Sequence, residues 1–221
     1  MTTIHSGTRG FGWCLILAGL CFISRAVTAF LTGPPPSVGT DILAWIDSAR
    51  FTMMLGNEAL VIGAGLLLAG FYGFQQAFIG KAPMKTTAGS ALLFAGCVVC
   101  LVLGIVQGRF VYPIYGIALV RPDEAELLVS IYFGGYHLVA LAFAAATTFW
   151  SLAMLRATGW LRLGFLGFPI AIGSVISSYP DLVGSLWVLV LESALALWWI
   201  GIGYQLLGGA TIDMRTDNAV A

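Results

Sequence analysis

The stretch LGNEALVIGAGLLLAGFYGF, residues 55 to 74, places Asn57 and Glu58 at the head of an apolar run. Across the whole chain of 221 residues, 59% of the side chains are hydrophobic and only 9% are charged. A soluble domain has about 45–50% apolar and about 25% charged residues. The solvent around this stretch is therefore expected to be lipid, and an amide and a carboxylate within it need polar partners.

The same stretch carries glycines at a regular spacing. Gly56, Gly63 and Gly70 recur every seven residues on one side, and Gly73 extends the set. A stripe of glycines lets a neighbouring helix approach closely, because no side chain stands between the two backbones. Close packing with another helix is the expected role of this face.

Six segments of the chain are long and apolar enough to cross a bilayer, which takes about 20 residues for a hydrocarbon core of about 30 Å. Continuous apolar runs favour helices, because a strand of a membrane barrel needs only about 10 alternating residues. Asp123 and Asp181 each follow a proline and are expected to cap the next helix. The sequence predicts an all-α polytopic membrane protein, a single domain of residues 1–221, with helices at about 11–31, 51–74, 87–108, 127–154, 161–179 and 183–207.

The basic residues predict the orientation of this six-helix bundle. Cytoplasmic loops of membrane proteins carry an excess of Lys and Arg. Six basic residues fall on the side of the N terminus and three on the other side: Arg9, Lys81, Lys85, Arg156, Arg162 and Arg215 against Arg50, Arg109 and Arg121. Both termini are therefore expected in the cytoplasm.

The first segment has a second interpretation as a signal peptide. Arg9 precedes its apolar stretch, and VTA at 27–29 has the small residues of a cleavage site. The interruption by Arg25 and the length from Phe11 to Leu31 favour a helix that is retained.

Four ionisable side chains on four of the expected helices fall at similar depths. At a rise of about 1.5 Å per residue, Glu58, His137 and Glu192 lie about 10–15 Å below the outer ends of their helices. Arg25 lies about 9 Å from the outer end of its own helix. A charge alone in lipid costs about 2.5–3.5 kcal/mol. We therefore expect the four to meet inside the outer half of the bundle, where Arg25 bridges both carboxylates.

Three interpretations of this polar layer remain open. In an enzyme for a lipophilic substrate, Glu58 and Glu192 act as acid and base of a cyclisation or isomerisation, with His137 as proton shuttle. In a binding, proton-coupled transport or sensory protein, the same layer holds a ligand. In a structural network, the polar layer only stabilises the packing of the helices. The side chains expected to contact the ligand, or to satisfy the layer, are Arg25, Asn57, Gln107, Tyr136, Ser174 and Ser193, with Trp198 deeper in the bundle.

The composition and the remaining motifs exclude several partners. Ten basic and ten acidic residues give no net charge, which argues against a nucleic-acid partner. CVVC at 97–100 lies inside an expected helix without a second pair, so the four cysteines are interpreted as small buried hydrophobes. Arg25 at the depth of His137 and the two glutamates opposes a metal ion there. No metal or cofactor is expected; membrane lipids or a lipophilic small molecule are the expected partners, and a homodimer if the protein is a transporter.

The last third of the chain resembles a known family. WLRLGFLGFPIAIG at 160–173, followed by LVLESALALWWIGIGYQLL at 189–207, is similar to the bacterial membrane family catalogued as domain of unknown function 4386. Members have a Trp-Leu-Gly stretch at the start of helix five and a Glu followed by Ala-Leu-Trp-Leu in the last helix; Glu192 and Trp198 match those places. The resemblance implies a multi-pass protein of the bacterial inner membrane and no mechanism. Glu58 departs from the family pattern.

Overall fold

The computed structural model describes residues 8–36 and 41–208. Within them, six helices are long and apolar enough to span a membrane. They are α1 (Thr8–Thr32), α3 (Arg50–Phe78), α4 (Pro83–Val111), α5 (Pro122–Met154), α6 (Leu161–Ser177) and α8 (Ser185–Leu207). The expected all-α bundle and its six helices are confirmed. Arg215, which counted toward the orientation, lies outside the described residues.

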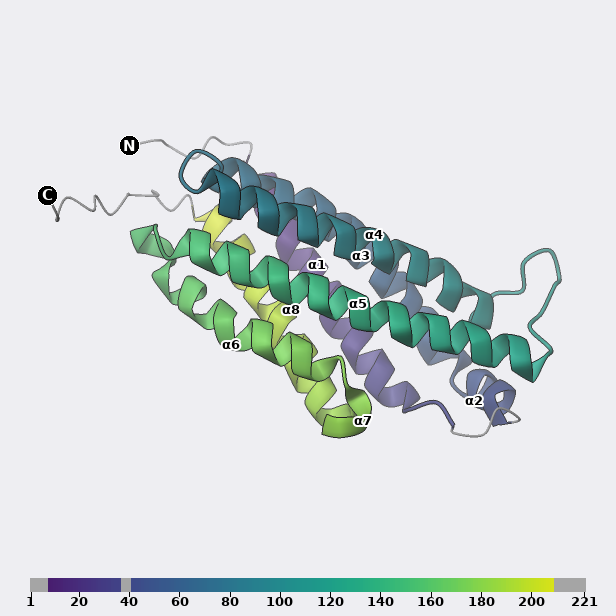
Figure 1. Cartoon of the computed structure of the whole chain (residues 1–221). Helices are drawn as coiled ribbons and strands as arrows, with labels where there is room; N and C mark the ends of the chain where they lie inside the picture. The colour runs from purple at the N-terminus through teal and green to yellow at the C-terminus, as the bar shows by residue number, and fades with distance from the viewer. Residues whose placement is uncertain (1–7, 37–40, 209–221) are drawn as a thin grey trace, which may run out of the picture.

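The six helices form a closed ring, in which each packs mainly on two neighbours. The order around the ring is α1, α3, α4, α5, α6 and α8, and α8 packs on α1 to close it. Figure 1 shows the long helices running side by side, with α1 among them although it comes first in the chain. Because α1 and α5 are three places apart in this ring, they face each other across its interior.

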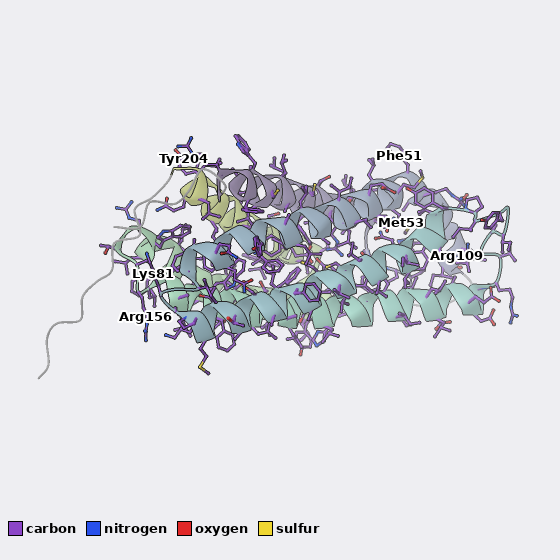
Figure 2. All side chains as sticks on the ribbon, turned by 90° about the horizontal axis from the view of Figure 1, so that it is seen from above. Phe51, Met53, Lys81, Arg109, Arg156 and Tyr204 are labelled. Carbon is purple, nitrogen blue, oxygen red and sulfur yellow. The ribbon has the colours of Figure 1, made fainter. Side chains whose placement is uncertain are left out.

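The two ends of the bundle differ. The beginning of α1 and the end of α8 lie at one end, called here the terminal end, with Lys81 and Arg156 (Figures 1 and 2). Two short helices lie at the other end: α2 (Ile42–Ser48) and α7 (Pro180–Val183). We call this the α2 end. The sequence predicts neither short helix as a separate element.

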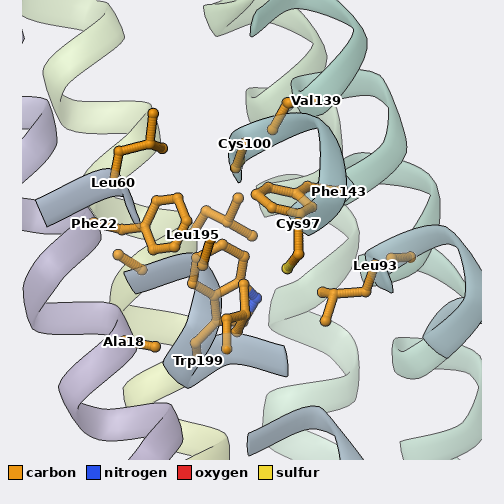
Figure 3. Packing of buried hydrophobic residues seen from close by; sticks show 14 of the residues in the cluster. Ala18, Phe22, Leu60, Leu93, Cys97, Cys100, Val139, Phe143, Leu195 and Trp199 are labelled. Atoms are coloured by element: carbon orange, nitrogen blue, oxygen red, sulfur yellow. The ribbon is translucent and has the colours of Figure 1, made fainter. Parts of the chain in front are cut away.

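Aromatic side chains fill the terminal half of the ring. Phe74 stacks on Trp150 with ring centroids 4.2 Å apart, and Phe78 meets the edge of Trp160 at 5.1 Å. Nearer the middle, Phe22 of α1 contacts Trp199 of α8 at 5.0 Å and reaches Phe143 of α5 across the ring at 6.0 Å (Figure 3). This half of the interior is therefore packed with apolar groups.

Glycines set the close approach of α1 to its two neighbours. A Cβ atom at Gly70 would lie 2.6 Å from Cγ of Leu15, and one at Gly203 would lie 2.6 Å from the carbonyl oxygen of Gly12. Gly63 and Gly73 likewise lie against side chains of α1. The packing role expected for the glycine stripe is confirmed.

The expected helix caps are wrong. Pro122 and Pro180 are the first residues of α5 and α7, because the fixed φ angle of proline suits the first helical position. Asp123 and Asp181 therefore lie inside the first turns, and the N-cap positions are occupied by Arg121 and Tyr179. Their negative charges still lie at the positive ends of the helix dipoles.

Candidate functional site

A cavity of about 690 Å³ lies at the α2 end of the ring. Its walls come from the last turns of α1, α4 and α6 and from the first turns of α3, α5 and α8, while α2 and α7 contribute near its mouth. All six long helices therefore contribute to one site. Small-molecule sites in proteins measure about 300–1,000 Å³, so this cavity has the size of a ligand site.

A buried ion pair joins two neighbouring helices in this cavity. Nη1 of Arg25, on α1, lies 2.6 Å from Oε2 of Glu192, on α8. The exposed fractions of the two side chains are 5% and 13%. Charges with so little exposed surface need compensation by a partner in direct contact. The expected meeting of Arg25 with Glu192 is therefore observed.

The same arginine reaches across the ring to α5. Its Nη2 donates a hydrogen bond of 3.2 Å to the hydroxyl of Tyr132, and its Cζ lies 3.7 Å from the ring centre of Tyr136. A guanidinium over an aromatic face is attracted by the negative charge of the π system. Arg25 thus ties α1 to α8 and to α5, and three groups compensate its charge.

Gln107 of α4 adds a buried amide to the lining of the cavity. Its Nε2 donates to the carbonyl oxygen of Met53, 3.5 Å away, and this bond fixes which way the amide points. Its Oε1 has no hydrogen-bond partner among the described residues. Gln107 therefore carries an acceptor without a partner that is enclosed by the protein next to the cavity.

Glu58 does not join this cluster, and the expectation that it meets Arg25 is wrong. Glu58 is exposed on the outside of the ring, and its Oε1 accepts a 2.8 Å hydrogen bond from the hydroxyl of Tyr112. This hydrogen bond is the main reason why the pKa of Tyr112 is raised above its ordinary value. On a helix, successive residues point about 100° apart, so the neighbouring Asn57 can face inward while Glu58 faces outward.

His137 lines the cavity beside α6 and α7. Its Nδ1 lies 3.4 Å from the carbonyl oxygen of Ser178, and its ring meets the edge of Tyr179 with centroids 5.0 Å apart. The structure thus brings five of the expected side chains to one cavity: Arg25, Gln107, Tyr136, His137 and Glu192.

Four expected contacts lie elsewhere, and one of them, Ser174, donates its hydroxyl to the carbonyl oxygen of Ile170 on its own helix. Asn57 is buried against α4, where Cβ atoms at Gly104 and Gly108 would lie 3.8 and 3.7 Å from its amide. Trp198 donates its indole N–H to the carbonyl oxygen of Leu163 at 2.8 Å, in the packed part of the bundle. Neither these two nor Ser193 is among the described residues that line the cavity. Asn57 and Ser193 lie at the predicted depth along their helices. Their side chains lie on a different side of the helix from the one that lines the cavity.

The structure adds residues that the sequence analysis missed. Tyr132 lies one turn before Tyr136 on the same face of α5, a spacing that brings two side chains together. Glu126 of α5 and Asp181 of α7 are exposed and line the cavity near its mouth. The four-residue spacing of the two tyrosines is visible in the sequence and predicts that they share a helix face. The position of Asp181 depends on the turn between α6 and α8, which the sequence does not predict.

The fold and the cavity together define a class of protein: a multi-pass helical membrane protein with a ligand-sized cavity at one end of its bundle. Comparison with family models, curated proteins and solved structures finds no match for this chain. The resemblance of residues 160–173 and 189–207 to domain of unknown function 4386 therefore stays a prediction. Among the described residues, no three His, Cys, Asp or Glu side chains are grouped so as to hold a metal ion.

Proposed function

We propose that this protein binds a small amphiphilic molecule in the cavity at the α2 end. The supporting observation is the cavity of about 690 Å³ beside the buried pair of Arg25 and Glu192. Protein interiors are packed as densely as organic crystals, so a network that only locks helices together needs no such space. Polar groups at the floor and apolar side chains on the walls suit a ligand with a polar end and an apolar body.

The proposed site opens to the outside of the cell. Lys81 and Arg156 lie at the terminal end, and the excess of basic residues on that side supports a cytoplasmic position for both termini. The resemblance to a bacterial family supports the inner membrane as the location. With this orientation, the α2 end faces the periplasm, and a ligand reaches the cavity without crossing the bilayer.

Binding is favoured over catalysis because the expected acid and base are not assembled. Glu58 lies outside the ring, and the carboxylate of Glu192 is engaged in the ion pair with Arg25. Acid–base chemistry on a lipophilic substrate is the second candidate, and the observation that favours it is His137 in the wall of the cavity. Chromatography coupled to mass spectrometry of lipids from cells with and without the gene distinguishes the two, because only an enzyme converts one lipid into another. A cyclisation or isomerisation keeps the mass of the lipid and changes its retention time.

A direct test uses N-phenyl-1-naphthylamine, a neutral amphiphile whose fluorescence rises in an apolar site. Val188 of α8 lines the cavity one turn before Glu192, so Val188→Trp fills part of the space. Leu197→Trp is the matched control, because Leu197 is exposed on the outside of α8. We expect saturable binding by the wild type and by Leu197→Trp, and binding at least about ten-fold weaker by Val188→Trp, a loss of about 1.4 kcal/mol. Equal binding by all three proteins in detergent would count against a ligand in this cavity.

A further inference from the structure

The cavity has an excess of negative charge. One arginine, Arg25, lines it against three carboxylates: Glu126, Asp181 and Glu192. Arg25 is in contact with Glu192, so these two charges largely cancel for any third group. Glu126 and Asp181 are left, and they reach the mouth from different elements, α5 and α7. A ligand that enters the cavity therefore meets two carboxylates that Arg25 does not compensate.

Several hydrogen-bond donors of the lining are already used within the protein. Four of its hydroxyl groups donate to carbonyl oxygens of their own helices: those of Thr28, Ser130, Ser177 and Ser178. The indole N–H of Trp45 is also used, because it donates to the carbonyl oxygen of Thr32. Oε1 of the buried Gln107 has no partner among the described residues, but the protein encloses it. Nε of Arg25 is a buried donor without a partner, but it belongs to a guanidinium whose charge is compensated.

Aromatic rings supply the apolar part of the wall. Phe110 of α4 and Phe133 of α5 each meet Tyr132 in an edge-to-face arrangement, with ring centroids 6.3 and 5.4 Å apart. All three residues line the cavity. Aromatic faces attract cations as well as apolar groups, so this wall is compatible with either part of an amphiphilic cation.

We infer that the ligand is a protonated amine with an apolar body, an inference that rests on the proposed binding function. Its ammonium group supplies both the positive charge that Glu126 and Asp181 attract and N–H donors for their carboxylate oxygens. Its apolar body lies against the aromatic wall. A carboxylate or phosphate of the same size is repelled by the two carboxylates and finds Arg25 already paired with Glu192.

The test compares three molecules with one apolar body and different heads: octylammonium, octanol and octanoate. Each displaces N-phenyl-1-naphthylamine from the purified protein in a neutral detergent at pH 7. We expect octylammonium to displace the probe at a concentration about ten-fold lower than octanoate, with octanol between them. Because Glu126 and Asp181 are exposed, we expect the ratio to fall as salt is added.

The variant Glu126→Gln with Asp181→Asn removes the two uncompensated charges. The matched control is Asp123→Asn with Glu124→Gln, which removes two exposed carboxylates of α5 that do not line the cavity and that lie near Arg121. We expect the first variant to lose the preference for octylammonium and the second to keep it. All four positions are exposed, and the thermal unfolding midpoint verifies that both variants fold.

The possible results separate the two proposals. If the probe binds and octanoate displaces it as well as octylammonium does, the amine is the wrong ligand class while the cavity remains a binding site. If both double variants lose the preference equally, the charge at the mouth is not the cause, and the inference fails. If the probe binds the wild type no better than Val188→Trp, the proposed function fails, and the amine inference fails with it.

Discussion

At the scale of single residues, Arg25 holds the α2 end of the ring together. It contacts Glu192 of α8 through an ion pair and both Tyr132 and Tyr136 of α5 from the opposite direction. Removing one partner of a buried pair leaves an uncompensated charge, whereas replacing both by apolar side chains is often tolerated. This asymmetry makes the role of the pair measurable.

The first prediction concerns the ion pair. Glu192→Gln leaves Arg25 buried without a counter-charge, so we expect it to lower the free energy of unfolding by about 3–5 kcal/mol. The double variant Arg25→Met with Glu192→Leu regains most of that loss. The measurement is unfolding by sodium dodecyl sulfate in mixed micelles, followed by circular dichroism.

The matched control for this prediction is Glu58→Gln. Glu58 is exposed and contacts only the hydroxyl of Tyr112 among the hydrogen bonds described above, so we expect a change within about 0.5 kcal/mol. If Glu192→Gln were no more destabilising than Glu58→Gln, the pair with Arg25 would have no role in holding the bundle.

The second prediction concerns the hydrogen bond across the ring. Tyr132→Phe removes the acceptor for Nη2 of Arg25 and keeps the aromatic ring. Hydrogen bonds to charged groups contribute about 1.5–3 kcal/mol, so we expect a loss of stability near the lower value. Tyr204→Phe is the control, because Tyr204 is exposed at the other end of the bundle. Equal unfolding curves for the two variants would contradict a link from α1 to α5.

At the scale of elements, α1 is the helix on which the ring depends. It packs on α3 and α8 through glycines, and it faces α5 through Phe22 and Arg25. In a bilayer, lipid tails are as apolar as the protein interior, so helices associate through close contact and polar bonds instead of through hydrophobic burial. The glycine contacts and the Arg25 cluster are therefore the expected sources of specific packing for α1.

The third prediction tests these glycine contacts. Gly203→Ala places a methyl group 2.6 Å from the carbonyl oxygen of Gly12, a backbone atom that cannot turn away, and we expect a loss of about 1–3 kcal/mol. Gly65→Ala is the control, because no atom lies within 4 Å of its added Cβ and alanine favours the helix. If thermal unfolding in detergent showed Gly65→Ala to be less stable than Gly203→Ala, the result would contradict the close packing of α8 on α1.

The helices could be predicted from the sequence, and their order in the ring could not. The thickness of the bilayer fixes how long an apolar segment must be, so six spans follow from composition alone. The rise per residue also places Arg25 and Glu192 at one depth. Which side of a helix faces inward is less evident, because both lipid and interior are apolar. For that reason Glu58 was expected in the site, and its neighbour Asn57 is the one that faces another helix.

At the scale of the whole molecule, the bundle has a packed half and a hollow half. Stacked rings of Phe74 and Trp150 occupy the terminal half, and the cavity with Arg25 and Glu192 occupies the α2 end. A ring filled in this way is not a pore through its length. This conformation suits a protein that binds a ligand from one side of the membrane.

The fourth prediction tests the side from which that ligand enters. Tyr115 and Met84 are among the most exposed residues, at 99% and 83%, and they lie at opposite ends of the bundle. In intact cells with a permeable outer membrane, we expect a maleimide that cannot cross the inner membrane to label Tyr115→Cys and not Met84→Cys. Labelling of Met84→Cys alone would reverse the proposed orientation.

The most direct test of the cavity is the reactivity of a cysteine placed inside it. In permeabilised membranes, Val188→Cys is treated with a water-soluble methanethiosulfonate that carries a trimethylammonium group, with Tyr115→Cys as the exposed reference and Leu197→Cys as the lipid-facing one. We expect Val188→Cys to react at a rate near that of Tyr115→Cys, because the cavity admits water and a small cation. A cysteine at 188 as unreactive as the one at 197 would contradict an accessible cavity beside Arg25 and Glu192.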